Sequence, residues 1–484
     1  MGSRRPMKRI VHAACDASAA LSMIRGVALT AILCAFACGC RTSYQQALQA
    51  REDIMFGTGE IAAGRAAKMA DSVVNRKLGS MELGRIKMLQ GDFAASSSLL
   101  GPQLEELFDD SNEGPVLKKG QIAGTVLAGT LADDRAIPYE LPAFELILGL
   151  QYQALNSLCL GERDNARVYL RRATAAQEQI KEEIEEASAA DTEDEDANNV
   201  ANATSAANEI TAKLAPIADA VRASYENALA WYLMGLAFSK EGDPGNAAIA
   251  YGEAAKISPA ISAFANPVPG AGQDVIVVYE EDLVDIKEPV KIPLPFGGTL
   301  WSVDFPVYNA APRIPAQVGV EVGGALAATC APVVNVRALA YRDLKDRIAG
   351  IATRNVTRAA VKIAAQQVAN HINTGNSLAN LCIKLGVLLV NIASTAVNEA
   401  DTRAWQTVPE FVHMARLRVP AEAHSLTLRN VATGRGCEVQ LPDGGDGTTI
   451  VWFTDVRGFA TVTTIPFGWN GQAGWARTES LLGR

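Results

Sequence analysis

The sequence has little of what common catalytic and metal centres need. It contains 4 histidines in 484 residues, and those that follow the N-terminal segment, His371, His413 and His424, stand at no metal-ligand spacing. The GxSxG, HExxH, P-loop and paired Cys–His signatures are also missing. We therefore expect no catalytic residue, no metal and no cofactor, and a protein that is not an enzyme.

An excess of positive charge is missing as well. The formal net charge is -9 and the isoelectric point is about 5.2. Nucleic-acid binding needs a surplus of lysine and arginine on one surface, so we expect no nucleic-acid partner. The hydrophobic content of 49% is typical of a chain that folds, and the length allows several domains.

Long hydrophobic runs are scarce near the N-terminus. The segment GVALTAILCAFA, residues 26–37, is too short to span a bilayer as a helix, and it follows a basic stretch. This pattern is typical of a signal peptide, which we place at residues 1–39. The best-shaped signal begins at Met23, so either the signal is long or translation starts downstream of Met1.

Cysteine is sparse except at the end of that apolar run, in AILCAFACGCRTS at residues 31–43. The site resembles a bacterial lipobox, in which small residues precede a cysteine that is acylated and becomes the first mature residue. Cys40, which follows Gly39, fits best, and Cys38 is the alternative. The large aliphatic residue usual three positions upstream is absent, and a signal peptide with incidental cysteines is the competing interpretation.

Acylation at this site would attach the protein to a membrane by its N-terminal lipid. By resemblance to enterobacterial lipoproteins, an aspartate after the acylated cysteine retains a protein at the inner membrane, and Arg41 stands there instead. We therefore expect an outer-membrane lipoprotein of the cell envelope that faces the periplasm. The cysteines beyond the anchor are either buried thiols or disulfide-bonded; they are Cys159, Cys330, Cys382 and Cys437.

One segment matches a tetratricopeptide unit closely. In AWYLMGLAFSKEGDPGNAAIAYGEAAKISP, residues 230–259, the small residues Gly235 and Ala247 allow two helices to approach, and Pro259 stops the second helix. The other matching positions are Trp231, Met234, Phe238, Tyr251 and Ala254. The turn of this unit contains Gly242, and two weaker copies earlier in the chain have Gly91 and Gly161 at the corresponding turns. The spacings between these glycines are too long for a regular tandem array.

The composition changes along the chain and predicts its organisation. An acidic stretch at 182–196 indicates a linker, short β-like runs follow residue 263, helix-like periodicity returns at 333, and alternating residues with Gly-rich turns end the chain. We expect an α+β multi-domain fold, in which an N-terminal tetratricopeptide-like helical array precedes a mixed helical/β C-terminal region. The predicted parts are a tetratricopeptide-like domain (40–180), an acidic/polar linker (181–207), a tetratricopeptide-like repeat (208–262), a small β region (263–332), a helical region (333–420) and an antiparallel β module (421–484).

Two stretches carry candidate partner-binding residues. Arg354, Arg358 and Lys362 continue a basic stripe from Arg347 along one predicted helix face. The stripe suits an anionic partner, whereas the favoured alternative is a solvated face paired with nearby acids such as Asp343.

The second stretch, EADTRAWQTVPEF, contains Asp401, Arg403 and Trp405 where a helix gives way to extended chain. These residues could form a recognition pocket. The favoured alternative is a packing role, in which Trp405 fills a core and the charged pair caps neighbouring backbone.

These segments together resemble a family of largely uncharacterised bacterial lipoproteins with tetratricopeptide-like helices. The resemblance covers about residues 80–430 and is most specific at Ala400–Pro409. No reaction is established in that family, whose members are envelope lipoproteins often encoded near regulators of peptidoglycan synthesis. The resemblance implies an envelope role and marks Arg354, Arg358, Lys362, Asp401, Arg403 and Trp405 as candidates.

The expected function is therefore a lipid-anchored scaffold that binds an envelope-assembly protein, with regulation of cell-wall synthesis as one such role. The alternative is an accessory component of exopolysaccharide export or of a secretion apparatus, contacted through the C-terminal β module. Glycan hydrolysis is a third hypothesis, and it would require two carboxyl groups facing one cleft. The oligomeric state is not determined by the sequence.

Overall fold

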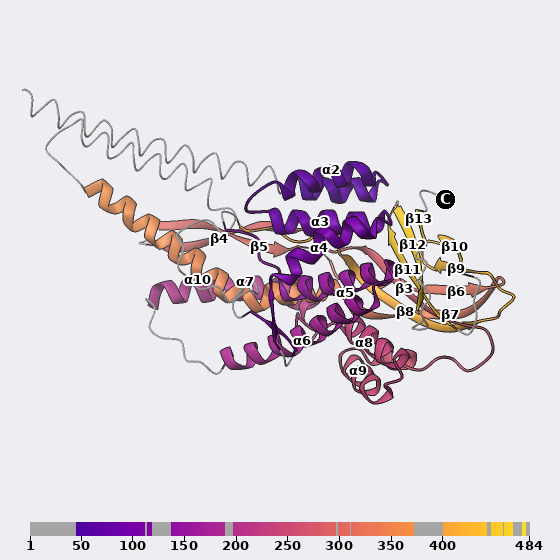
Figure 1. Cartoon of the computed structure of the whole chain (residues 1–484). Coiled ribbons are helices and arrows are strands. Elements are labelled where there is room, and N and C mark those ends of the chain that lie inside the picture. The colour runs from indigo at the N-terminus through magenta and orange to yellow at the C-terminus, as the bar shows by residue number, and fades with distance from the viewer. Residues whose placement is uncertain are drawn as a thin grey trace, which may run out of the picture.

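The computed structural model describes residues 45–111, 114–118, 137–188, 197–296, 299–309, 311–371, 400–442, 447–457, 459–467 and 477–480. An N-terminal helical region packs against a C-terminal sheet that curls toward a barrel (Figure 1). The fold is thus α+β, as the sequence predicted.

The helical region begins with a helix over 45–55 and continues in consecutive helices. They are α2 (Gly59–Ala70), α3 (Arg76–Leu89), α4 (Phe93–Glu105), α5 (Ala143–Cys159), α6 (Arg163–Ser188), α8 (Ala228–Lys240) and α9 (Pro244–Ile257), with the short strands β1 (Phe108–Ser111) and β2 (Gly114–Leu117) after α4. A 3-10 helix, η2 (Pro259–Phe264), leads into the sheet.

Helices pair into hairpins at the predicted turns. Gly91 joins α3 to α4, Gly161 joins α5 to α6, and Gly242 joins α8 to α9, with φ angles of 80°, 78° and 77°. A side chain at such a left-handed position is strained, so glycine favours this turn. Asp92 and Asp243 then cap the following helices by accepting hydrogen bonds from backbone amides at 3.1 and 3.0 Å.

Close approach of the helices depends on small residues, as predicted for the third hairpin. A Cβ atom added to Gly235 of α8 would lie 2.7 Å from the ring of Tyr251 in α9. A Cβ atom on Gly84 of α3 would lie 2.7 Å from Leu100 of α4 in the same way. The two hairpins are therefore packed at a distance that a larger side chain would prevent.

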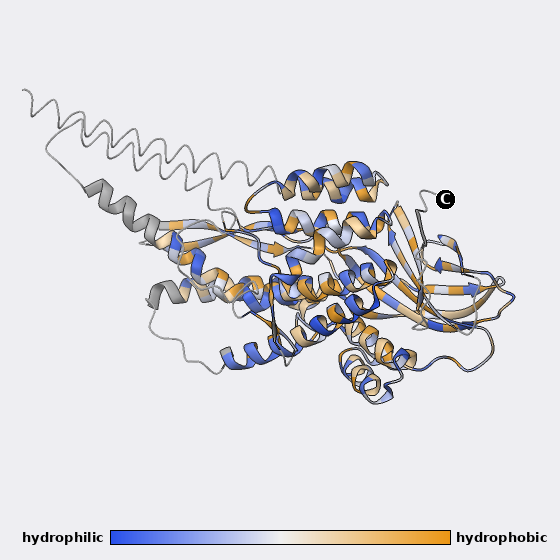
Figure 2. Ribbon diagram, viewed as in Figure 1, coloured by the Kyte–Doolittle hydropathy of each residue, from blue (hydrophilic) through white to orange (hydrophobic). Residues whose placement is uncertain are grey.

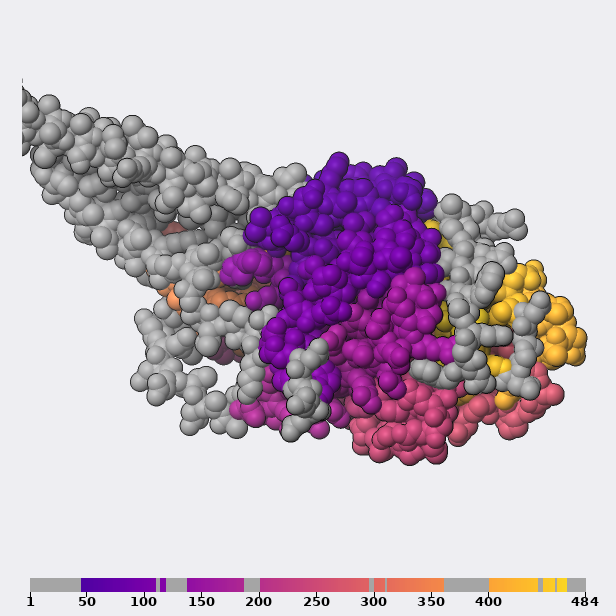
Figure 3. All heavy atoms as spheres, in the orientation of Figure 1, coloured from indigo at the N-terminus to yellow at the C-terminus, as the bar shows by residue number. Residues whose placement is uncertain are grey.

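The hairpins form two layers that differ in burial. The first helices (45–55, α3, α5 and α8) lie against the sheet, and all of α5 from Ala143 to Cys159 is buried. The second helices (α2, α4, α6 and α9) face outward, and α9 buries Ala247, Ala250 and Ala254. Figure 2 shows the corresponding hydrophilic surface along the far end of α6, and Figure 3 shows the helices covering one face of the molecule.

The main sheet has nine strands in the order β10-β9-β6-β7-β8-β3-β11-β12-β13. The strands are β3 (Gln273–Leu283), β6 (Val318–Val322), β7 (Ala325–Asn335), β8 (Pro409–Val419), β9 (Ser425–Asn430), β10 (Gly436–Gln440), β11 (Thr448–Val456), β12 (Phe459–Phe467) and β13 (Arg477–Ser480). The pair β3–β11 is parallel, and the other neighbours are antiparallel.

Residue alternation gives the sheet two apolar faces. In β3, Val275 and Val277 point into the curled interior, where they meet side chains from the strands β6 to β12. Ile276 and Val278 point the other way and join the large core shared with the helices. The central strand is therefore buried on both faces, which explains its continuous apolar run VIVV.

The prediction of two separate β regions, 263–332 and 421–484, is wrong. Strands from both regions join one sheet, and β8 lies between them although a helical region was predicted up to residue 420. The parallel pairing places Asp274 opposite Thr448. The sequence did not reveal this because strand partners so far apart in the chain leave no local signal. The predicted linker at 181–207 also contains the end of α6 and the start of α7.

A projecting arm completes the structure. It consists of α7 (Ala197–Ala218), α10 (Val336–His371) and the hairpin of β4 (Lys287–Phe296) with β5 (Thr299–Tyr308). These elements contact one another and extend together away from the sheet (Figure 1). Among the described residues no helix has the length and hydropathy of a membrane span. Residues 372–399 of the predicted helical region lie outside them.

Candidate functional site

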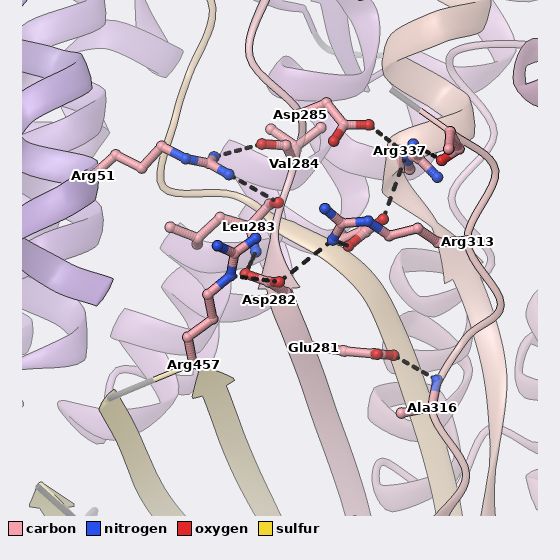
Figure 4. A network of polar contacts seen from close by, with 12 residues as sticks. Arg51, Glu281, Asp282, Leu283, Val284, Asp285, Arg313, Ala316, Arg337 and Arg457 are labelled. Atoms are coloured by element: carbon pink, nitrogen blue, oxygen red, sulfur yellow. Dashed lines mark hydrogen bonds and ion pairs between the residues drawn. The ribbon is translucent and has the colours of Figure 1, made fainter. Parts of the chain in front are cut away.

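A buried polar junction connects the helical array with the sheet. It forms where the acidic end of β3, residues 280–285, and the segment Ala400–Val408 meet the first helices. We call that second segment the strap. Figure 4 shows how arginines from several elements surround residues 281–285.

Glu280 of β3 is a fully buried acid of the junction. It forms an ion pair with Arg85 of α3, and the two side chains are 0% and 1% exposed. The hydroxyls of Tyr152 and Thr454 donate to its carboxylate at 2.8 and 2.6 Å. Because every partner comes from a different element, the carboxylate joins α3 and α5 to the middle of the sheet.

Asp282 stands where β3 leaves the sheet. Arg313 and Arg457 approach its carboxylate at 3.5 and 3.3 Å (Figure 4). Asp282 and Arg457 have φ angles of 49° and 34°, and they are the non-glycine residues with positive φ in the described parts of the chain. The two strained positions therefore face each other across the ends of neighbouring strands.

Asp285 connects the junction with the arm. Arg337 at the start of α10 pairs with Asp285 and also lies 3.4 Å from Glu410. The hydroxyl of Tyr341 donates to Asp285 at 3.0 Å. Burial raises the pKa of Glu410 to about 7, while Arg313 and Arg337 oppose that shift.

Arg51 ties the first helix to both segments. Its guanidinium donates to the carbonyls of Leu283 and Val284 on one side (Figure 4). On the other side it donates to the carbonyl of Gln406 in the strap at 3.3 Å. Burial lowers the pKa of Arg51, and Asp282 and Asp285 oppose this. The side chain thus joins the end of β3 to the strap through backbone carbonyls of both segments.

The strap is held by acids of the array through its backbone. The amide of Trp405 donates to Glu145 of α5 at 3.0 Å, and the next amide, that of Gln406, donates to Glu82 of α3 at 2.5 Å. Both carboxyl groups are 0% exposed. Burial raises the pKa of Glu82 to about 8 and that of Glu145 to about 7, although the amide hydrogen bonds lower them.

The predicted residues Asp401, Arg403 and Trp405 all lie in the strap. The Trp405 side chain is 0% exposed. Its ring meets the ring of Tyr152 edge-on, with 5.9 Å between the ring centroids, and its Nε1 donates a hydrogen bond to the hydroxyl of Thr407 at 2.9 Å. A recognition pocket built on this indole is therefore closed to a partner. The burial agrees with the packing alternative.

The charged pair of the strap acts on neighbouring backbone. Arg403 forms a two-point ion pair with Asp401 at 2.8 Å and donates to the carbonyl of Ile137 at 3.0 Å and to Asn75 at 3.2 Å. Lys287 of β4 donates to the carbonyl of Arg403 at 3.0 Å. Arg403 thus binds the strap to the loop before α5, and this also agrees with the packing alternative.

The basic stripe on α10 is not a uniform solvated face. Arg347 pairs with Asp343, as the sequence predicted, with Nε at 2.9 Å from the carboxylate. Arg354 is half-buried, and Arg358 is 8% exposed and contacts Asn355. Lys362 belongs to α10, but its side chain lies outside the described residues. The structure does not bring Arg358 to an open surface.

The cysteine predictions meet the structure only in part. Cys40 and Cys38, the candidate acylation sites, lie outside the described residues, and so does Cys382. Cys159, Cys330 and Cys437 are thiols in the structure. Burial raises the pKa of the Cys159 and Cys330 thiols, so both are poor nucleophiles.

The chemistry of the junction is that of a structural connection. No group of three metal-ligating side chains occurs in the part of the chain that the structure describes. Glu82 and Glu145, which hold neighbouring amides of the strap, are fully buried, so no substrate reaches them in this structure. Sequence reasoning missed the acids at 280–285, although the acids that follow VIVV and Tyr279 were a usable signal.

Known proteins offer no further guide to this site. A comparison with protein-family models found no match, and no curated protein is significantly similar to the chain.

Proposed function

We propose that the protein is a lipid-anchored, periplasm-facing scaffold that binds an envelope-assembly protein through the outer layer of its helical array. The hairpins act as tetratricopeptide-like repeats, and acylated Cys40 holds the array at the outer membrane. The scaffold performs no reaction of its own. Regulation of cell-wall synthesis is the role that the resemblance to envelope lipoproteins favours.

The observation that carries this proposal is the contrast between the two helical layers. The inner layer is filled by the sheet and the strap, whereas the outer layer keeps large aliphatic side chains in solvent. Ile61 of α2, Val168 of α6 and Ile249 of α9 are 53%, 42% and 63% exposed. Exposed apolar side chains on the outer helices of three hairpins are a suitable surface for another protein.

Site-specific crosslinking in cells tests the proposal. A photoreactive amino acid replaces Ile61, Val168 or Ile249, and crosslinked proteins are identified after purification from the membrane. We expect one envelope-assembly protein to be captured at two or more of these positions. A matched position on the edge strand β10, the exposed Glu438, should capture nothing.

The pattern of capture separates the alternatives. A polysaccharide-export or secretion protein captured at Glu438 and not at the helices would favour the alternative function. Capture at none of the positions would contradict the scaffold proposal.

The membrane anchor is tested separately. Cys40→Ala should abolish incorporation of labelled palmitate and release the protein from the membrane fraction, whereas Cys38→Ala should not. Labelling that survives Cys40→Ala and is lost in Cys38→Ala would move the anchor to the alternative position.

A further inference from the structure

The strap is bound by the inner layer of the array in the way an extended peptide ligand would be. Its backbone amides donate to Glu145 and Glu82, its carbonyl at Gln406 accepts from Arg51, and Trp405 packs on Tyr152. The strap has no helix or strand of its own between residues 400 and 408. Side chains of the array therefore bind the strap backbone at Trp405 and Gln406.

We propose that Glu82 and Glu145 form a pH-sensitive latch on the strap, and that ionisation of both carboxyl groups releases the strap from the inner face of the array. The closed form is the one described above. This inference goes beyond the scaffold function and does not depend on the lipid anchor or on the outer layer.

The position of the two acids supports the latch. They lie on neighbouring first helices, both are fully buried, and they hold consecutive amides of one short segment. Two ionised carboxylates this close, without water, destabilise the closed state. When the strap leaves, both carboxyl groups become hydrated, so ionisation favours opening.

The other charged groups at the site offset only part of the cost of ionising Glu82 and Glu145. Glu82 faces Arg51 and the second acid Glu145, besides the hydroxyl of Thr407. Glu145 faces Lys287 of β4, which favours its ionisation, and Asp343 of α10, which opposes it, and it accepts from the hydroxyl of Tyr139 at 2.7 Å. Burial lowers the pKa of Lys287, which weakens the compensation further.

The direction of the pH effect follows from linkage. Burial raises the pKa of both acids above their ordinary value of 4.5, to about 8 for Glu82 and about 7 for Glu145. The closed state is therefore fully stabilised below about pH 4.5, and this stabilisation is lost as the pH rises through 7 and 8. Between the ordinary pKa of each carboxyl group and its raised pKa in the closed state, ionisation changes the opening equilibrium by about tenfold per pH unit.

Hydrogen exchange of the full chain in mild detergent measures the latch directly. The readout is exchange of the strap amides between pH 5.5 and 8.5, corrected for intrinsic rates, in the native protein and in a Glu82→Gln, Glu145→Gln variant. Glutamine keeps an acceptor oxygen and does not ionise. We expect at least a tenfold gain in corrected exchange for the native protein and none for the variant.

A control and a second variant keep the test decisive. Glu253→Gln changes an exposed acid of α9 that pairs with Lys256, and its exchange should follow the native protein. If the double variant does not fold, the single variant Glu82→Gln takes its place, and it should lose part of the pH response. Equal corrected exchange in the native and variant proteins at pH 8.5 would overturn the latch.

Discussion

The two layers of the helical array show how one repeat pattern serves two purposes. In the inner layer α5 is buried along its whole length, and its Glu145 and Tyr152 side chains form hydrogen bonds with distant parts of the chain. In the outer layer α9 buries three alanines and leaves Ile249 exposed. We therefore expect the inner layer to determine the stability of the protein and the outer layer, in the proposed function, to contact the partner.

The largest test of this comparison removes a charge from the inner layer. Arg85→Ala should lower the free energy of unfolding by about 3–5 kcal/mol, because it leaves Glu280 as an unpaired buried charge. Denaturant titration measures the loss. Adding Glu280→Gln in the same chain should restore part of it, and a loss below about 1 kcal/mol for Arg85→Ala would show that the pair is not buried as described.

A slightly smaller effect is expected from the strap. Trp405→Ala should cost about 3–4 kcal/mol, because the indole is fully enclosed and the cavity cannot collapse against Tyr152. Thermal unfolding measures the change. Trp405→Phe, which keeps the aromatic contact and loses the hydrogen bond to Thr407, should cost much less.

The boundary between the layers is tested at Gly235. Gly235→Ala should destabilise by about 1–3 kcal/mol, because the new methyl group would meet the ring of Tyr251 at 2.7 Å. Gly252→Ala in α9 is the matched control, since a Cβ atom there meets nothing within 4 Å. A neutral result at Gly235 would mean that the hairpin can open without loss.

The smallest effect on stability should come from the outer layer. Ile249→Ser should change the free energy of unfolding by no more than about 0.5 kcal/mol, as for other exposed positions. The same variant should reduce capture of the partner by crosslinkers at Ile61 and Val168. A large stability loss without reduced capture would reverse the roles given to the layers.

What the sequence predicted depends on how local the signal was. Gly91, Gly161 and Gly242 identified the hairpin turns, because a left-handed turn and its cap are decided within a few residues. Gly235 likewise revealed a close contact within a single hairpin. Local chemistry was enough in both cases.

The junction was not accessible in that way. Arg85 and Glu280 are 195 positions apart, and Arg403 reaches a carbonyl 266 positions earlier. Each is an ordinary charged residue in its own stretch of sequence, and its partner is decided by the folded chain. The charged residues of the strap were singled out from the sequence, but their sequence context did not distinguish a core contact from a binding surface.

The position of β3 in the sheet also has a consequence for synthesis. The strand pairs with β8 and β11, which follow it by more than a hundred residues, and the strap that covers α3 and α5 arrives equally late. The array emerges first, with an apolar inner surface that its own chain has not yet covered. A nascent chain of this protein therefore has to be shielded until its last strands are made, and truncation before residue 400 should yield insoluble product.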